Sequence, residues 1–482
     1  MSLPALGLLL TLLLAPLRPV ADPPPRAVRG VVFILTDDQR ADFLGAAGRA
    51  GLDTPAIDAL AARGTRFTRA YCQGSRSPAV CLPSRSRMLT GGSDWTTPNW
   101  SQAQQRDDLP LWPELLRDAG WRTHHVGKWH AGRRWFDRAF ESGSSVLFGG
   151  MGSHWTLEVE DRPLDGPATR RPLVDYSTRE FGTDAATFVH EHLTTEPDRP
   201  FLLHLCFTAP HDPRTAPGDE DVSERASRVQ LPENALPVHP FDNGEMTIRD
   251  ETLLGWPRTE QDLRREIAVY EMMIEEIDAQ VAGIIATLEA NDALDDVLIV
   301  FASDHGLALG SHGLLGKQSL YEHSMRAPMI LAGPGFEDGG VRDDFAYLHD
   351  LAPTMLAACG IEIPASMGGH DLHGPTGRDH VLLRYRDLQR SWRNDRWKVI
   401  WHPRIDRRQV FDLANDPEET VDLARAPANA ALVARLRREL DAARAEAGDD
   451  VDLLVERPAD ESFDVERANE RRLNGRHHWT LR

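Results

Sequence analysis

Continuous apolar segments dominate the hydrophobic pattern of the chain. The longest cover residues 31–35, 201–207 and 297–301. Shorter strand candidates lie at residues 122–126 and 329–332. Runs without polar alternation are typical of strands buried on both faces, as in a parallel sheet. The pattern therefore predicts a mostly parallel central sheet.

The segments between these strands have helical periodicity, most clearly at residues 260–290. Apolar side chains recur there every three or four positions, at Leu263, Ile267, Tyr270, Ile274, Ile277, Val281, Ile284 and Leu288. Thr259 and Asp262 resemble the start of a capping box. Alternating strands and helices predict an α/β fold.

The pattern changes after Gly377. Short strand-like segments at 379–384, 397–401 and 409–413 precede an Ala- and Arg-rich helix at 428–447. We therefore expect a catalytic domain over residues 28–376, a small C-terminal α+β subdomain over 377–448, and a charged, poorly patterned segment over 449–482 that is either extended or mobile.

An apolar run from Leu6 to Leu17 opens the chain, and a Pro-rich stretch follows it. The run is too short to span a bilayer comfortably, and its length fits the apolar region of a secretory signal. We expect a signal peptide over residues 1–21, export to the periplasm or the medium, and no stable membrane span. A short membrane anchor is the alternative.

The composition is that of a globular protein, with 41% hydrophobic and 27% charged residues in a chain of 482. The formal net charge of -20 argues against nucleic acid as the main partner, because proteins that bind it carry basic surfaces. An anionic small substrate is still compatible, since a pocket needs only a few local cations. The four cysteines are too few for a disulfide scaffold, and their spacing matches no zinc motif.

Polar residues stand directly after the three long strands. Asp37 and Asp38 follow the first, His211 follows the second, and Asp304 with His305 follows the third. Ligands bind outside the carboxyl ends of strands in open α/β sheets, so we expect these side chains to meet. Carboxylates at short range raise each other's pKa, and a Ca2+ or Mg2+ ion would resolve that conflict. Taken singly, the acids could instead cap a helix or belong to a turn.

The segment Cys81-Leu-Pro-Ser-Arg85 has the features of a helix start, with a proline in the first turn. The free N–H groups of a helix N-terminus stabilise an anion, so we expect a lowered pKa for the Cys81 thiol. Lys128 with His130, and Lys317, add cations and an imidazole in Gly-containing loops. A buried cysteine and two solvated lysines are the alternatives.

The order of these motifs resembles the formylglycine-dependent, type I sulfatases of the alkaline phosphatase superfamily. Cys81-Leu-Pro-Ser-Arg85 with Thr90-Gly91 is similar to the Cys-x-Pro-Ser-Arg signature, and residues 120–130 are similar to the second signature. Further blocks follow in the family order, at Asp37-Asp38, Ala209-Pro-His211, Ser303-Asp-His-Gly306, Gly316-Lys317, Trp397-Lys398 and residues 410–418. The resemblance covers nearly the whole chain after the signal.

The resemblance implies an alkaline-phosphatase-like α/β/α sandwich with a small C-terminal sheet subdomain. It implies that a formylglycine-generating enzyme oxidises Cys81 to formylglycine. It also implies a bound Ca2+, with Mg2+ as the alternative, on Asp37, Asp38, Asp304 and His305. The family often has Asn at the position of His305, and an imidazole is an unusual ligand for a hard cation.

The resemblance further implies hydrolysis of a sulfate ester. Arg85 and Lys128 would stabilise the aldehyde hydrate, and Lys317 and His211 would contact the sulfate. One hydroxyl of the hydrate would attack sulfur while His211 protonates the leaving oxygen, and His130 would then take the proton of the other hydroxyl as sulfate leaves. The two histidines could exchange roles.

The substrate is less determined than the reaction. Residues 211–217 and 239–245 look most like the glycan-directed and iduronate-type sulfatases, so we expect a sulfated saccharide, with a small sulfate ester as the alternative. Two other functions stay open. One is phosphonate monoester or phosphodiester hydrolysis within the same superfamily, and the other is binding of a sulfated glycan by a chain that never matures.

Overall fold

The computed structural model describes residues 28–474 apart from 99, 104–105 and 337, so the predicted signal peptide lies outside the described residues. A ten-stranded sheet has the order β13-β2-β12-β10-β1-β9-β5-β6-β7-β8. Its middle is parallel and consists of β10 (Val297–Ser303), β1 (Gly30–Thr36), β9 (Phe201–Cys206) and β5 (Arg122–Lys128). Apolar runs predicted β1, β9 and β10, and the mostly polar β5 was expected as a shorter strand candidate. Each of the four is buried along its length.

Shorter strands extend the sheet on both sides. On one side β12 (Met329–Ala332), predicted from its apolar run, pairs antiparallel with β10 and is followed by β2 (Thr65–Phe67) and β13 (Gly340–Arg342). The other side continues with β6 (Ser142–Leu147), β7 (Glu158–Arg162) and β8 (Thr169–Pro172). These last three strands have polar or partly exposed sequences, so no apolar run revealed them.

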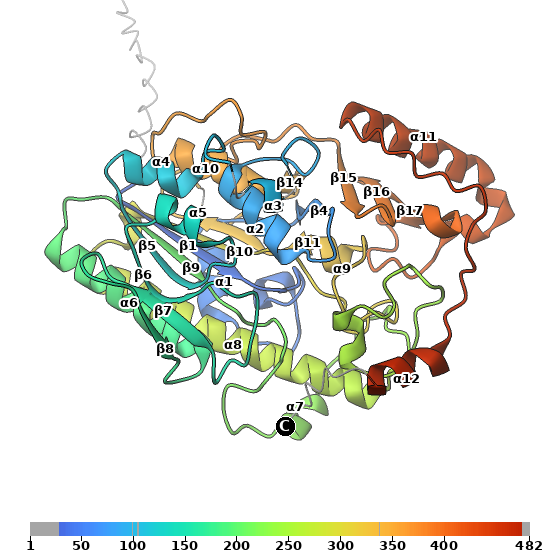
Figure 1. Cartoon of the computed structure of the whole chain (residues 1–482), viewed down its shortest axis with the longest axis horizontal. Helices are drawn as coiled ribbons and strands as arrows, with labels where there is room; N and C mark the ends of the chain where they lie inside the picture. Colours follow the sequence, from blue (N-terminus) through green and yellow to red (C-terminus); the bar gives the residue numbers. More distant parts are fainter. Residues whose placement is uncertain (1–27, 99, 104–105, 337, 475–482) are drawn as a thin grey trace, which may run out of the picture.

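Helices cover both faces of this sheet and complete the predicted α/β/α sandwich (Figure 1). Val32 and Ile34 of β1 face one layer, which contains α1 (Pro55–Arg63), α6 (Ser177–Thr195) and α8 (Glu260–Ala290). Phe33 and Leu35 face the other layer, with α2 (Cys81–Thr90), α4 (Trp112–Asp118), α5 (Arg133–Ala139) and α10 (Leu351–Ala358). The alternation follows from the two-residue period of a strand.

Helix α8 has the bounds that its periodicity predicted, and the Thr259 hydroxyl accepts a hydrogen bond from the backbone N–H of Asp262 over 3.1 Å. The remaining short elements of the main body are α3 (Trp100–Ala103), α7 (Val222–Ala226), α9 (Glu322–Met325), β3 (Ala70–Tyr71), β11 (Arg326–Ala327) and β14 (Ala346–Tyr347). No helix among the described residues combines the length and apolar character needed to cross a membrane.

A second, five-stranded sheet has the order β18-β17-β16-β15-β4 and carries α11 (Ala430–Glu446) on one face. Its strands are β15 (His380–Tyr385), β16 (Gln389–Asn394), β17 (Trp397–His402), β18 (Arg407–Asp412) and β4 (Gly74–Ser75). The sequence pattern predicted three of them and missed the polar β16. It also missed β4, which comes from the N-terminal part of the chain.

The segment after α11 is more structured than its charged sequence predicted. It contains α12 (Val465–Asn474), and the Asn469 side chain exchanges hydrogen bonds with the backbone of Trp256. At its start, Asp449 is buried and accepts hydrogen bonds from Arg390 over 2.7 and 3.2 Å. The expectation of an extended segment was therefore wrong for these parts, because the contacts that order them come from distant positions in the sequence.

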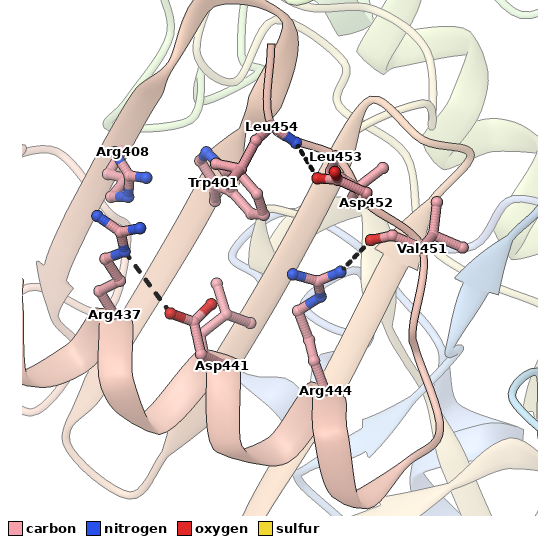
Figure 2. Close-up of a pocket in the computed structure, with 10 residues that line it drawn as sticks. Trp401, Arg408, Arg437, Asp441, Arg444, Val451, Asp452, Leu453 and Leu454 are labelled. Atoms are coloured by element: carbon pink, nitrogen blue, oxygen red, sulfur yellow. Dashed lines mark hydrogen bonds and ion pairs between the residues drawn. The ribbon is translucent and has the colours of Figure 1, made fainter. Parts of the chain in front are cut away.

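A surface cavity of about 170 Å3 lies between α11, β17 and the segment 451–454 (Figure 2). Arg444 of α11 closes one side of it by donating to the carbonyl of Val451 over 2.8 Å. Arg444 also donates to Asp449 over 2.7 Å, so that carboxylate serves two guanidinium groups. The segment after α11 is thus held against the second sheet by charge pairs.

Replacing Asp449 with Ala should lower the free energy of unfolding by about 3–5 kcal/mol, because the Arg390 guanidinium would stay buried without its carboxylate. Denaturant unfolding followed by fluorescence measures this change. The adjacent Asp450 is exposed and provides the control, since Asp450→Ala should change the free energy by less than about 0.5 kcal/mol. Similar effects of the two substitutions would contradict the role given to the buried pair.

Candidate active site

The carboxyl ends of β1 and β10 bring three buried carboxylates together. These strands are in parallel register up to the pair Thr36 and Ser303, so Asp37-Asp38 and Asp304 leave the sheet side by side. The backbone N–H of Asp38 donates to Asp304 Oδ1 over 3.1 Å. The φ of Asp38 is 69°, a left-handed conformation that aspartate tolerates better than most residues.

Cys81 is the first residue of α2 and lies directly against this acidic group. Its Sγ is 3.1 Å from His305 Nε2, 3.1 Å from Lys317 Nζ and 3.7 Å from Asp38 Oδ1. Residue 81 is therefore within a side chain's reach of the acidic pair, although 43 residues separate it from Asp38 in sequence.

Three buried cations are paired with the three acids, namely Lys128 with Asp37, Lys317 with Asp38 and Arg85 with Asp304. Lys317 Nζ lies 2.8 and 2.9 Å from the two carboxylate oxygens of Asp38. Arg85 Nε lies 2.9 Å from Asp304 Oδ2. Buried charges are tolerated in a protein interior only when they are paired and hydrogen-bonded in this way.

Burial alone would raise the pKa of all three acids, and the neighbouring cations decide the outcome. The pKa of Asp37 lies below its ordinary value because Lys128 and other cations outweigh its burial. The pKa of Asp304 is also lowered, because His305, Arg85 and Lys128 together outweigh its burial. At Asp38, burial outweighs the attraction of Lys317 and raises the pKa to about 6. Of the three acids, Asp38 is therefore the one whose negative charge is least compensated by neighbouring cations.

The predicted lowering of the Cys81 pKa was wrong. Burial raises the pKa of this thiol well above its ordinary value, and the Lys317 ammonium offsets only part of that increase. The surrounding carboxylates raise the thiol pKa further, since a thiolate would add another negative charge. An unmodified Cys81 is consequently a neutral thiol and a poor nucleophile in this site.

The two predicted histidines lie near the acidic group. His211 Nδ1 donates to the carbonyl of Asp212 over 2.6 Å, and His211 Nε2 is 3.8 Å from Asp38 Oδ2. His130 has a φ of 63°, and its Nδ1 has no hydrogen-bond partner. Burial, with help from nearby lysines, lowers the pKa of His130 to about 3 and pushes the pKa of His211 well below its ordinary value. Both imidazoles are neutral in this state.

The acidic group has the donor atoms for a metal ion. Ligand atoms of Asp37, Asp38, Cys81 and His305 all lie within 4.8 Å of one another. Asp304 Oδ1 is 3.6 Å from His305 Nε2. Asp37 Oδ1 is buried and has no hydrogen-bond partner, as expected for an atom that accepts a cation. The three carboxylates and one imidazole therefore fit a hard divalent ion such as Ca2+ or Mg2+.

Sequence reasoning missed two side chains that position the acids. The Tyr270 hydroxyl donates to the carbonyl of Asp38 over 2.6 Å, but the helical periodicity of α8 assigned this residue to the core. The Ser84 hydroxyl donates to the carbonyl of Asp304 over 2.6 Å and fixes the first turn of α2 over β10. Ser84 belongs to the Cys-x-Pro-Ser-Arg motif, which is a sequence signal for its role.

Comparison with known proteins identifies the family. The model described as Sulfatase matches residues 29–361, and the model described as N-sulphoglucosamine sulphohydrolase, C-terminal, matches residues 310–446. Arylsulfatase K from Xenopus laevis is 27% identical over 443 residues, which cover 82% of this chain and 78% of that protein. Choline-sulfatase from Rhizobium meliloti (strain 1021) is 28% identical over 425 residues, which cover 82% and 80% of the two chains.

Solved structures share the fold. One is a protein in complex with its substrate D-glucosamine-2-N,6-O-disulfate, with a TM-score of 0.67, 21% identity and coverage of 88% of this chain and 98% of that chain. Another is phosphonate monoester hydrolase from Silicibacter pomeroyi, with a TM-score of 0.66, 24% identity and coverage of 87% and 96%. Because the Sulfatase model spans well over half of the sequence, including Cys81 and the three acids, the chain belongs to the sulfatase family and is a type I sulfatase of the alkaline phosphatase superfamily that hydrolyses sulfate esters.

Proposed function

We propose that a separate maturing enzyme oxidises Cys81 to formylglycine and that the mature protein hydrolyses a sulfate ester on a saccharide. The observation that carries the proposal is the position of Cys81 Sγ, 3.1 Å from both His305 Nε2 and Lys317 Nζ. The buried thiol is a poor nucleophile because its pKa is raised. A hydrated aldehyde at the same position supplies two hydroxyls on one carbon, one to attack sulfur and one to expel sulfate afterwards.

We propose Ca2+ as the metal, with Mg2+ as the alternative. Its ligands would be Asp37, Asp38, Asp304 and His305, an oxygen-rich set of the kind that hard cations favour. When bound, the ion supplies positive charge that favours the ionised nucleophile and neutralises sulfate oxygens. The raised pKa of Asp38, about 6, supports this assignment, because it indicates that the neighbouring cations only partly compensate the buried negative charge.

Lys128 and Lys317 are the residues proposed to bind the sulfuryl oxygens, with Arg85 stabilising the nucleophile. The side chains of all three are at most 4% exposed. Solvent and salt therefore screen their charges weakly, and each contributes more to an anionic transition state than an exposed lysine or arginine would.

His211 is proposed as the general acid and His130 as the general base. His211 uses Nδ1 to bind the Asp212 carbonyl, so its Nε2 is free to carry the proton that the leaving oxygen needs. Its low pKa without substrate means that it must gain a proton on binding, and a nearby sulfate anion favours that gain. His130 is neutral and has a free Nδ1, as a base requires.

The saccharide part of the proposal is supported by two similarities. Residues 310–446 match the C-terminal model of N-sulphoglucosamine sulphohydrolase, and a solved structure of the same fold contains D-glucosamine-2-N,6-O-disulfate as its substrate. The second candidate is phosphonate monoester hydrolysis, favoured by a fold match of almost equal TM-score, 0.66 against 0.67. Both substrate classes carry an anionic tetrahedral group that the same cations would bind.

Mass spectrometry of the purified native protein should find an aldehyde or its hydrate at residue 81, and Cys81→Ser should abolish multiple turnover. A serine could accept the sulfuryl group, but it has no second hydroxyl with which to expel sulfate. The variant should therefore show at most one turnover per chain, measured as released alcohol in a burst experiment. Continued multiple turnover by Cys81→Ser would contradict the proposal that formylglycine at residue 81 is the nucleophile.

The two histidine assignments predict different leaving-group dependence. His211→Ala should lower kcat for a sugar sulfate by roughly 100- to 10,000-fold but should affect an aryl sulfate with an acidic phenol much less, because that phenolate leaves without a proton. His130→Ala should slow both substrates to a similar degree, since its step follows departure of the alcohol. Steady-state kinetics on both esters measures this, and the opposite pattern would exchange the two roles.

A substrate panel separates the two candidate reactions. We expect kcat/KM to be highest for a sulfated mono- or oligosaccharide, lower for choline sulfate and aryl sulfate, and lowest for an aryl phosphonate monoester. The same preparation must show a modified residue 81, which excludes inactive material as the cause of low rates. Higher kcat/KM for the phosphonate than for every sulfate ester would favour the second candidate.

A further inference from the structure

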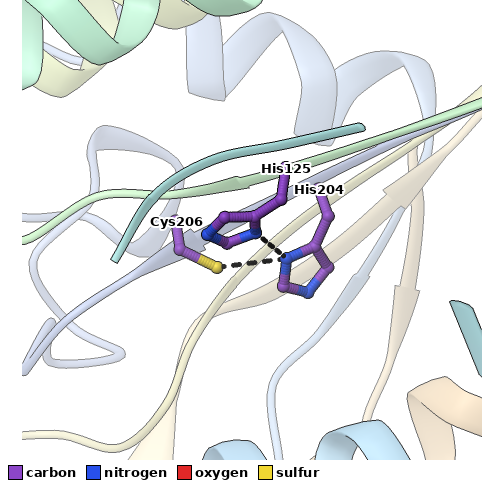
Figure 3. A group of neighbouring side chains, drawn as sticks. All are labelled: His125, His204 and Cys206. Atoms are coloured by element: carbon purple, nitrogen blue, oxygen red, sulfur yellow. Dashed lines mark hydrogen bonds between the residues drawn. The ribbon is translucent and has the colours of Figure 1, made fainter. Parts of the chain in front are cut away.

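A second group of metal-binding side chains lies inside the sheet and has no part in the proposed reaction. His125 of β5 and His204 of β9 are direct partners in the parallel register, and Cys206 lies two residues farther along β9. All three side chains therefore project from the same face of the sheet and meet there (Figure 3). Their ligand atoms lie within 4.8 Å of one another, and all three residues are buried.

Hydrogen bonding fixes the positions of the imidazole protons in this cluster. His125 Nε2 lies 3.2 Å from the carbonyl of Gly127 and must donate to it, so His125 Nδ1 carries a lone pair. That atom accepts a hydrogen bond from His204 Nδ1 over 3.0 Å, so His204 carries its proton on Nδ1, and His204 Nδ1 is 3.5 Å from Cys206 Sγ. Burial lowers the pKa of His125 to about 3 and pushes the pKa of His204 well below its ordinary value, so both imidazoles are neutral.

The spacing of the three donors is that of a small coordination site. Ligands around a three-coordinate ion with bonds of about 2 Å lie about 3.5 Å apart. The Cys206 to His204 separation of 3.5 Å already matches this value, and the two imidazole nitrogens need to open by only about half an ångström from 3.0 Å. The Gly127 carbonyl fixes the ring of His125 in the way that outer-shell acceptors hold metal-binding imidazoles.

The surroundings select the charge of the ion. Phe33, Trp112 and Trp129 form apolar walls of the adjoining cavity. Its volume of about 10 Å3 leaves room for a single ion or water molecule. The one charged residue that lines it is Arg85. Burial raises the pKa of the Cys206 thiol to about 12, and the nearby Arg85 guanidinium offsets only part of that increase, so the thiol keeps its proton until an ion displaces it. Any ion here is enclosed in a dry site next to a positive charge, where a net positive complex is costly.

We propose that His125, His204 and Cys206 bind one monovalent copper ion, Cu+. The ion would replace the proton of the Cys206 thiol, which leaves as H+, and the proton of His204 would move from Nδ1 to Nε2, so that each neutral imidazole donates the lone pair of its Nδ1 to the ion. The resulting complex of Cu+, one thiolate and two imidazoles is electrically neutral. Zn2+ in the same place would carry a net charge of about +1 beside Arg85, and it prefers a fourth ligand, whereas a soft thiolate favours Cu+.

The test uses the full-length chain with Cys81→Ala, so that the active-site thiol cannot contribute. Cu+ is titrated anaerobically against a chromophoric chelator, and the copper K-edge is measured on the loaded protein. We expect one copper per chain with one sulfur and two nitrogen ligands. Cys206→Ser and His125→Gln in this background should each bind Cu+ at least about 100-fold more weakly, more than the loss seen when only an outer-shell group is removed.

Cys72→Ser is the matched control. Cys72 is a similarly buried thiol that lies outside the cluster and hydrogen-bonds with the backbone of Gly74, so this variant should bind Cu+ like the parent. Copper retention by Cys206→Ser, a spectrum without two nitrogen ligands, or equal binding of Zn2+ would overturn the proposal and leave the cluster as a hydrogen-bonded part of the core. If a ligand variant fails to fold, the copper K-edge spectrum of the Cys81→Ala protein alone tests whether one sulfur and two nitrogen atoms bind the ion. Because Cys81 is replaced by Ala in every variant, the result does not depend on the proposed catalytic function.

Discussion

The burial of three carboxylates at one edge of the central sheet is the constraint on which the rest of the structure depends. Leaving one of them buried without its partner would cost about 3–5 kcal/mol. The chain meets this constraint with cations from three separate segments, since Lys128 ends β5, Arg85 lies on α2, and Lys317 comes from the loop after β10. Those segments must therefore converge on the ends of β1 and β10, and their convergence forms the site.

The same burial determines what chemistry the site can perform. It raises the pKa of the Cys81 thiol and of Asp38, so the cluster disfavours additional negative charge. A thiolate nucleophile is unsuited to such surroundings, whereas an aldehyde hydrate that acquires its charge next to a divalent cation is compatible with them. The proposed modification of Cys81 and the proposed metal thus have one physical origin, the exclusion of water from a group of like charges.

The second sheet supports the active site from a distance. Gln389 of β16 accepts a hydrogen bond from the backbone of Leu320 over 3.1 Å and donates to the carbonyl of Gln318 over 3.1 Å, which fixes the loop that carries Lys317. The strand β4 from the N-terminal part of the chain completes this sheet. Gly74 within β4 has a φ of 90° and lies against the carbonyl of Arg384, so a side chain there would collide with β15.

The sequence by itself determined the local structure and the chemical inventory of this protein. Continuous apolar runs specified β1, β9 and β10, the 3.6-residue period specified α8, and short motifs identified the acids, the cysteine and the cations, because these signals depend only on neighbouring residues. Tertiary structure decided the pKa of Cys81, the place of β4, the burial of Asp449 and the meeting of His125 with Cys206. Each of these depends on desolvation or on contacts between distant segments, and neither effect can be predicted from a local sequence pattern.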